Sequence, residues 1–434
     1  MRRWLKGPLL MAALSLALAA APARAQTPDP EAVRKEIAQL RKEFEQIRKE
    51  YGERLAALEA KVASSAPTAQ DQSLATPASP VPVAAEVQPQ PPPMPAITSS
   101  AGASKAFNPD ISVIGNFLGA AGRSTGNPDP AKALELHESE LALQAVVDPY
   151  ARADFFISFG EQGVNVEEGF LTFPTIPGGL LLKVGKMRAA FGKVNGLHTH
   201  VLPWADRPLV TRDLVGGEDG IDDAGISVAR LIPNPWFFLE ATGQVFRGDS
   251  ADVFQSSQRG DLSYLGRLRA YQDLGESTNI DLGASVTTGH NNAGVTNGVD
   301  LGRFTTRLFG VDATLRWKPL QRSIYHSFIA RSEFVWSRRE QDGGPQSAFG
   351  YFVSGDYQLG RRWFAGARLD RSAHADNAAL LDTGQALVLT YMPSEFSVIR
   401  GMYRRTNYAR QIQTSNEFLM QFQFAIGAHG AHPF

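Results

Sequence analysis

The segment YARADFFISFG, residues 150–160, decides the fold because its apolar residues recur at every second position. Alanine, phenylalanine and isoleucine occupy one parity, whereas Arg152, Asp154 and Ser158 occupy the other. Successive side chains of a β-strand point to opposite faces, so this segment predicts a strand with one apolar and one polar face. The same alternation recurs in residues 309–317 and 363–370. Such strands suit a barrel in lipid, which is apolar outside and polar inside.

Segments of this kind follow one another from residue 105 onward, and their connections differ by parity. Numbered along the chain, each even-numbered strand is joined to the next odd-numbered strand by a tight connection, such as Asp148-Pro149 or Pro393. Most connections from an odd-numbered to an even-numbered strand are longer and polar. Short periplasmic turns and long external loops are typical of outer-membrane barrels. We therefore predict an all-β transmembrane barrel of about 16 antiparallel strands in residues 105–434. The predicted strands are 109–119, 134–147, 150–161, 164–173, 179–188, 222–232, 236–247, 261–272, 278–290, 304–318, 323–337, 347–359, 361–373, 384–392, 394–405 and 416–427.

The composition excludes several classes of protein. The 434 residues contain no cysteine, which excludes a disulfide scaffold, a thiolate metal site and a cysteine nucleophile. No run of about 20 apolar residues follows the N-terminus, so we expect no helical membrane span in the mature chain. The formal net charge of −1 argues against nucleic-acid binding, which usually needs a basic excess. We also expect no enzymatic activity, because no strand-face Ser or Thr has a His and a carboxylate placed beside it.

The chain begins with a predicted signal peptide, residues 1–25. This segment has a basic start, an apolar stretch rich in alanine and leucine, and the cleavage signal Ala23-Arg24-Ala25. Residues 64–104, directly before the predicted barrel, are rich in proline and alanine and predict an extended linker. Export and a barrel together place the mature protein in the outer membrane of a Gram-negative bacterium.

Residues 26–63 are predicted to form a periplasmic coiled coil. Apolar residues from Val33 to Tyr51 are spaced 4-3-4-3-4, which is the seam of a left-handed coiled coil. A lone helix with such a stripe is marginal in water, so we expect oligomerisation, although a helix folded back on its own barrel is an alternative. The aromatic residues Phe44 and Tyr51 in the seam favour a homotrimer. The coiled coil is also a candidate for contact with peptidoglycan.

Aromatic residues are placed where a barrel meets lipid headgroups. Trp236, Trp317 and Trp363 lie at the ends of predicted strands, as interfacial girdles require. The last strand is amphipathic and the chain ends in Phe434. This ending resembles the signal recognised by the barrel-insertion machinery. We therefore expect outer-membrane lipid and that machinery as partners.

The longest connection, residues 189–221, is the first candidate functional segment. In the general porin family, which the predicted barrel resembles, a long loop folds into the lumen and narrows the pore. Charges of both signs at such a constriction act on passing ions at close range. The alternative is an external loop whose charges are solvated. The predicted constriction residues are Lys193, His198, His200, Asp206, Arg207, Arg212 and Asp213, and Glu218 and Asp219 follow in the same loop.

Arginine is the main cation of the predicted barrel, where 25 Arg accompany 6 Lys in residues 105–434. Several arginines and carboxylates lie on strand faces opposite apolar residues, so we expect them to line the lumen. Guanidinium groups suit transient contacts with phosphate or carboxylate solutes. Arginine–carboxylate ladders that hold the wall together are an equal alternative. The predicted lumen residues are Arg152, Asp154, Arg267, Arg269, Asp312, Arg316, Arg331, Glu333, Arg368 and Asp370.

Two histidine pairs are candidate metal ligands. His198 and His200 lie in the long connection, and His429 and His432 lie at the C-terminus. Two closely spaced imidazoles can reach one zinc ion, and Asp206 or Asp213 could complete the first site. The two pairs belong to opposite ends of the predicted barrel, so a shared site is not expected. Apart from this zinc, we expect no cofactor.

Several motifs carry a more specific resemblance. They are FNPDISVIG (107–115), VDPY (147–150), EEGF (167–170), KVGKMRAAFG (183–192), the run from His198 to Leu209, and GAHGAHPF (427–434). On these motifs the chain resembles a family of outer-membrane barrels labelled zinc-regulated, TonB-dependent receptors, which are related in shape to phosphate-selective porins. The resemblance implies an outer-membrane location and metal-linked uptake. The sequence lacks a recognisable TonB-contact box and plug domain, and the predicted strands are fewer than the 22 of plugged transporters.

Together these features predict a porin-like outer-membrane channel for passive diffusion of small hydrophilic solutes or ions. One alternative is a metal-ion (zinc) uptake barrel without a plug, which would use the histidines. Another is an envelope tether that grips the cell wall through the coiled coil.

Overall fold

The chain is described here by a computed structural model that covers residues 109–427, apart from 162, 251, 252, 297, 298 and 301, together with the helical residues Lys42 and Lys49. The chain divides into two units, Met1–Pro89 and Gln90–Phe434, and the second unit contains the barrel. The predicted signal peptide, the linker, and His429, His432 and Phe434 lie outside the described residues. The same holds for the coiled coil except for its two helical lysines.

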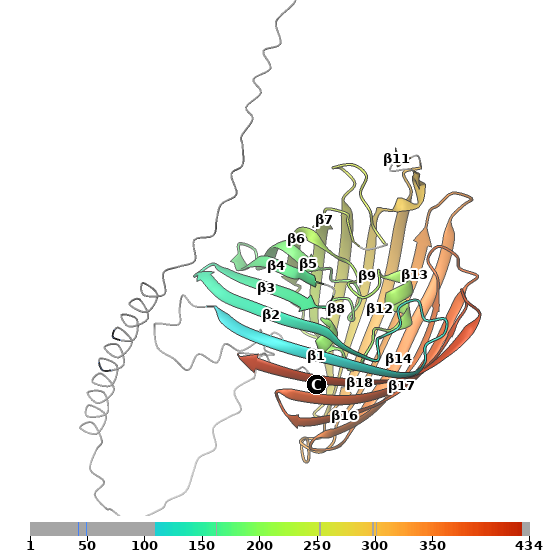
Figure 1. Cartoon of the computed structure of the whole chain (residues 1–434). Helices are drawn as coiled ribbons and strands as arrows, with labels where there is room; N and C mark the ends of the chain where they lie inside the picture. Colours follow the sequence, from blue (N-terminus) through green and yellow to red (C-terminus); the bar gives the residue numbers. More distant parts are fainter. Residues whose placement is uncertain are drawn as a thin grey trace, which may run out of the picture. The chain divides into compact units, whose positions relative to one another are not determined.

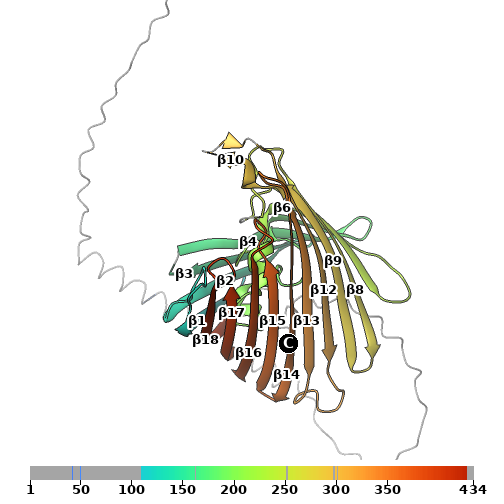
Figure 2. The same ribbon diagram turned by 90° about the vertical axis from the view of Figure 1, so that its right-hand side faces the viewer.

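Sixteen antiparallel strands form a closed barrel, as predicted, in which the first strand pairs with the last (Figures 1 and 2). Each strand is also hydrogen-bonded to its neighbours in the sequence, so the topology is a simple meander. The strands are β1 (Asp110–Arg123), β2 (Leu134–Asp148), β3 (Ala151–Gly160), β4 (Gly163–Ile176), β5 (Leu180–Arg188), β6 (Asp222–Leu231), β7 (Phe238–Phe246), β8 (Ser263–Gly275), β9 (Thr278–His290), β12 (Thr305–Trp317), β13 (Phe328–Arg339), β14 (Gln346–Gly360), β15 (Trp363–Ala373), β16 (Leu381–Ser394), β17 (Ser397–Tyr408) and β18 (Gln413–Gly427).

One connection differs from the prediction. β13 begins at Phe328 rather than at residue 323, because residues 321–325 form a turn in which Arg322 has a φ of 68°. The connection between β3 and β4 is short, as the predicted strands 150–161 and 164–173 require. In the β9–β12 connection, β10 (Val295–Thr296) and β11 (Val299–Asp300) form a small hairpin outside the barrel sheet.

The outer surface of the barrel is apolar and its inner surface carries most of the polar groups. Val286 of β9 is 54% exposed and Phe309 of β12 is 47% exposed, whereas the neighbouring Ser285 and Asp312 are buried. Aromatic pairs also lie on the wall, such as Trp363 and Tyr391, whose ring centroids are 4.6 Å apart beside the short turns. None of the helices among the described residues is long and apolar enough to cross a membrane. An apolar outer surface around a closed barrel indicates contact with lipid.

We expect Leu387→Arg to destabilise the protein in lipid by about 2–4 kcal/mol, because Leu387 lies midway along β16 and is 63% exposed on the apolar surface. Urea unfolding in lipid vesicles measures the loss. Ala379→Arg, in the exposed β15–β16 loop, is the matched control and should change stability by less than about 0.5 kcal/mol. Equal, small effects of both substitutions would mean that the wall faces water.

Candidate functional site

The connection between β5 and β6, residues 189–221, lies inside the barrel, and we call it the lumen loop (Figure 1). It contains the 3₁₀ turn η2 (Thr199–Val201) and the short helix α2 (Leu209–Leu214). The helix packs against β13, β14, β15 and β16. Elsewhere the loop is hydrogen-bonded to β4, β7, β9, β13 and β17, so it contacts the wall around most of the circumference.

Apolar contacts hold the lumen loop in place, so the interior is not polar throughout. Trp204 meets the ring of Phe352 edge-on, with centroids 5.2 Å apart, and both side chains are fully buried. Phe191 lies against Gly310 of β12, where a Cβ atom would come within 2.9 Å of its ring. Inward-facing Leu308, Met402 and Leu419 belong to the same buried cluster. Burial of this apolar surface, at roughly 25 cal/mol per Å², stabilises the loop inside the barrel.

The two ends of the lumen loop are joined to each other. The backbone N–H of Ala189 donates to the carbonyl of Ile221 over 2.8 Å. The amide of Asn195 also accepts from Ile221 N–H and donates to both carbonyls. Gly192, with a φ of 58°, approaches the Glu333 carboxylate where any side chain would overlap it. The loop is therefore closed at its base and seated on β13.

Asp206 is the centre of an ion-pair ladder on one side of the lumen loop. Its carboxylate lies 2.9 Å from the guanidinium of Arg368 and 2.7 Å from that of Arg404. These arginines also pair with Asp370 and Glu417 of the wall. Burial raises the pKa of Asp206, but the two guanidinium groups outweigh burial and hold its pKa below the ordinary value. Asp206 therefore remains ionised and fastens the loop to β15 and β17.

A basic cavity of about 70 Å³ lies between the lumen loop and the wall. It is lined by Lys193, Arg316 and Arg331, by the carboxyl group of Glu333, and by Trp204 and Phe352. Lys193 pairs with Asp281 over 3.0 Å, and burial lowers its pKa. Arg331 pairs with Asp356, whereas Arg316 forms no ion pair with any described residue. An unneutralised guanidinium in a cavity is available to a passing anion.

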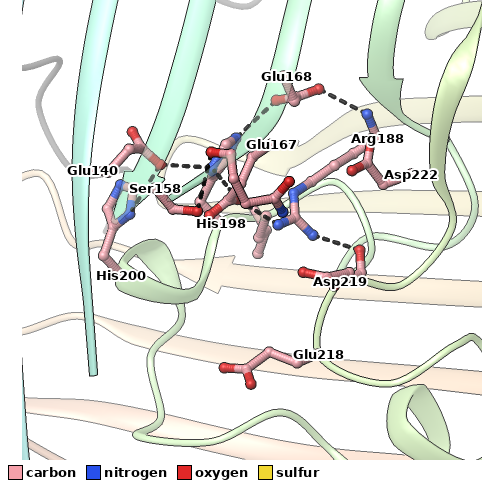
Figure 3. A network of polar contacts seen from close by, with 12 residues as sticks. Glu140, Ser158, Glu167, Glu168, Arg188, His198, His200, Glu218, Asp219 and Asp222 are labelled. Carbon is pink, nitrogen blue, oxygen red and sulfur yellow. Dashed lines mark hydrogen bonds and ion pairs between the residues drawn. The ribbon is translucent and has the colours of Figure 1, made fainter. Parts of the chain in front are cut away.

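An acidic cluster surrounds His198 on the opposite side of the loop, and Figure 3 shows its side chains converging. Nδ1 of the imidazole lies 2.7 Å from Glu140 and 3.1 Å from Glu167, and Nε2 lies 2.8 Å from Glu168. Arg188 pairs with Glu167 over 2.5 Å. Burial lowers the pKa of His198, but the three carboxylates outweigh burial and raise its pKa well above the ordinary value.

All seven predicted constriction residues lie within the lumen loop inside the barrel. Arg207 donates to the carbonyls of Val194 and Leu197 and so braces the loop itself. Arg212 pairs with Asp213 and with Asp382 of β16. His200 lies beside His198, with ring centroids 5.7 Å apart. Asp206 and Asp213 pair with arginines, so neither joins the two histidines as the sequence analysis had suggested.

Most predicted lumen residues form ion pairs with one another, within a strand or between nearby strands of the wall. These pairs support the alternative of arginine–carboxylate ladders. Arg152 pairs with Asp154, Arg267 with Asp312, and Arg269 with Asp281. Other residues that contact the lumen loop or support these contacts were not among the predicted site residues. They are Glu140, Glu167, Glu168, Arg188, Arg400 and Arg404.

A β-bulge explains why the acidic cluster was missed. Phe156 is paired with Glu168 and Ile157 with Val166, so Glu167 is an extra residue in β4. Strict alternation would point Glu167 and Glu168 to opposite faces, whereas the bulge lets both reach His198. The sequence signal for this cluster was the pair of adjacent carboxylates, Glu167 and Glu168, within a strand whose alternate residues should face lipid.

Comparisons with known proteins agree with the fold. No protein-family model matches the chain. An uncharacterised protein of Aquifex aeolicus (strain VF5) is 28% identical over 389 residues, which cover 76% of this chain and 81% of that protein. The anion-selective porin from Comamonas acidovorans is structurally similar, with a TM-score of 0.52, 10% identity, and coverage of 73% of this chain and 99% of that chain. OprB of Pseudomonas putida has a TM-score of 0.50, 10% identity, and coverage of 74% and 94%. The chain therefore has a porin-like barrel fold.

We expect Asp206→Ala to destabilise the lumen loop by about 1.5–3 kcal/mol, because it removes the carboxylate between Arg368 and Arg404 while each arginine keeps one carboxylate of the wall. Proteolysis of the folded protein, with fragments assigned by mass spectrometry, would detect cleavage within residues 189–221. Asp376→Ala removes the exposed partner of Arg410 and should cost no more than about 1 kcal/mol, with no new cleavage. Protection of the loop in both variants would contradict its anchoring by Asp206.

Asp213 should make loop stability depend on pH. Burial raises the pKa of Asp213 to about 6, so its ionisation is unfavourable in the folded loop. The penalty is absent at pH values below the unfolded pKa of about 4 and complete above pH 6. We therefore expect Asp213→Asn to stabilise the protein relative to the natural chain at pH 7.5 but not at pH 3.5. Thermal unfolding at both pH values checks this, and a pH-independent difference would contradict it.

Proposed function

We propose that the protein is a channel of the Gram-negative outer membrane through which small hydrophilic solutes or ions diffuse. The observation that carries this proposal is the lumen loop, which crosses a closed barrel with an apolar exterior and presents charges to its interior. A barrel closed around a water-filled lumen needs no energy source for passage, and a loop inside it narrows the path.

The arrangement of charge supports a role in selecting ions. Carboxylates around His198 come from β2 and β4, whereas Arg316 and Arg331 belong to β12 and β13. In the order of the barrel, β13 lies opposite β3, so these groups belong to opposite walls. An ion that passes the lumen loop therefore meets acidic groups on one wall and basic groups on the other.

The predicted constriction residues fall into two roles under this proposal. Asp206, Arg207 and Arg212 are held in ion pairs or backbone contacts, so they position the loop. Lys193 is paired with Asp281 but also borders the basic cavity beside Arg316, so we assign these two side chains to the solute path. The proposal also includes a homotrimer joined by the periplasmic coiled coil, which lies outside the described barrel residues. An envelope tether, gripping peptidoglycan through that segment, remains the alternative.

Replacing residues 192–218 with a short Gly-Ser linker should raise single-channel conductance several-fold, because this removes the loop from the lumen. The ends of the loop are hydrogen-bonded to each other at Ala189 and Ile221, so β5 and β6 can stay joined. Planar-bilayer recording in KCl measures the change, and a trimer should conduct in steps of three. Conductance that is unaltered by the replacement, or absent from both proteins, would refute a channel narrowed by this loop.

The double substitution Lys193→Gln and Arg316→Gln should shift ion preference toward cations. Each removed charge changes the energy of a nearby anion by about 1 kcal/mol, or about five-fold, so we expect the two substitutions together to lower the anion-to-cation permeability ratio about thirty-fold. The reversal potential in a KCl gradient gives this ratio. Arg410→Gln, at an exposed site on the β17–β18 connection, is the matched control and should leave the ratio unchanged. An equal permeability ratio in the natural chain, the double variant and Arg410→Gln would mean that the basic cavity does not border the path of the ions.

A further inference from the structure

Three donor side chains from distant parts of the chain converge inside the barrel. Glu140 comes from β2, Glu167 from β4 and His198 from the lumen loop, and Figure 3 shows them pointing toward one another. One donor atom from each lies within 4.8 Å of the other two. All three side chains are buried, with Glu140 only 2% exposed. This is the spacing of ligands around a single metal ion.

The closest contact in this cluster is the ion pair between His198 and Glu140. Nδ1 of His198 lies 2.7 Å from Oε2 of Glu140 and 3.1 Å from Oε2 of Glu167. Both atoms are buried, and their contact does not have the angles of a hydrogen bond. A divalent cation would take the place of the proton on Nδ1 and hold the imidazole and the carboxylates together.

The other ring nitrogen of His198 is already engaged. Nε2 lies 2.8 Å from Oε2 of Glu168 in a hydrogen bond. Binding of a metal ion at Nδ1, which faces Glu140 and Glu167, would displace the proton from that nitrogen while Nε2 keeps its hydrogen bond to Glu168. Metal-bound histidines almost always donate their second N–H to a carboxylate or carbonyl, which fixes the ring. Glu168 occupies this supporting position.

A fourth donor lies next to the cluster. Nδ1 of His200 is 3.6 Å from the same Glu140 oxygen, and the residue is buried. Arg188 holds Glu167 through an ion pair and donates its backbone N–H to Glu168, so it orients the two carboxylates. Two imidazoles and two carboxylates form a mixed nitrogen and oxygen set, which suits zinc-like ions better than calcium or magnesium.

We propose that Glu140, Glu167, His198 and His200 bind one divalent transition-metal ion of the zinc class. The ion joins the lumen loop to β2 and β4, whereas the Asp206 ladder joins it to β15 and β17. The loop is then fastened to the wall at both sides. This site does not depend on conduction, so a failure of the channel proposal would leave it intact.

Calorimetric titration of the purified, chelator-treated full chain with Zn²⁺ tests the proposal. We expect one tight site per chain, no comparable binding of Mg²⁺, and a higher Tm with bound zinc. Glu140→Gln and His198→Gln should each weaken binding at least ten-fold, and His326→Gln, at a histidine in the β12–β13 turn, should not. Replacing both His429 and His432 with Gln should also leave this site unchanged.

The visible absorption of bound Co²⁺ gives a second readout that needs no substitution. A buried four-ligand site with nitrogen and oxygen donors should give intense d–d bands, and Zn²⁺ should abolish them. The proposal is overturned if the natural chain binds no Zn²⁺ and shows no such bands. It is also overturned if binding survives Glu140→Gln and His198→Gln but is lost with His429 and His432.

Discussion

The pairing of β1 with β18 is the contact on which the rest of the structure depends. A strand in lipid has no water to satisfy its backbone N–H and C=O groups, so a sheet that crosses a membrane must close on itself. Twelve residue pairs, from Ser112–Gly427 to Arg123–Asn416, make this closure. Once the ring is closed, strand alternation separates an apolar exterior from an enclosed interior. The enclosed interior is what allows charged side chains to be buried at the depth of the membrane.

The lumen loop acts as the core of this barrel. Its apolar side chains pack on inward-facing residues such as Phe352, and its charged side chains meet opposite charges on the wall. Both kinds of contact are needed, because burying a charge without a partner is costly and a purely ionic loop would exchange partners with water. Arg316, which forms no ion pair with any described residue, lies at a cavity between the loop and the wall. Charges of both signs are present on every part of the wall that the loop contacts, and most of them are neutralised in pairs.

Much of the fold could be predicted from the sequence, since alternation and turn residues are local signals. The strand count, the parity of the connections and the unusual length of residues 189–221 all follow from them. The contacts that make the site could not be predicted, because they join residues far apart in the chain, such as His198 and Glu140. The bulge at Glu167 reverses the parity on which the strand faces were assigned. Inward-facing Met402 and Leu419 make sense only when the loop is known to cover them.

The most direct test of a lumen loop that borders the solute path uses the absence of natural cysteine. In Lys193→Cys, a thiol reagent carrying a bulky charged group can react only at this position of the loop. Single-channel current should be recorded in a planar bilayer before and after addition of the reagent, with labelling confirmed by mass spectrometry. A stepwise fall in conductance as each subunit reacts is the result we predict. Full labelling with no change in current would contradict the account.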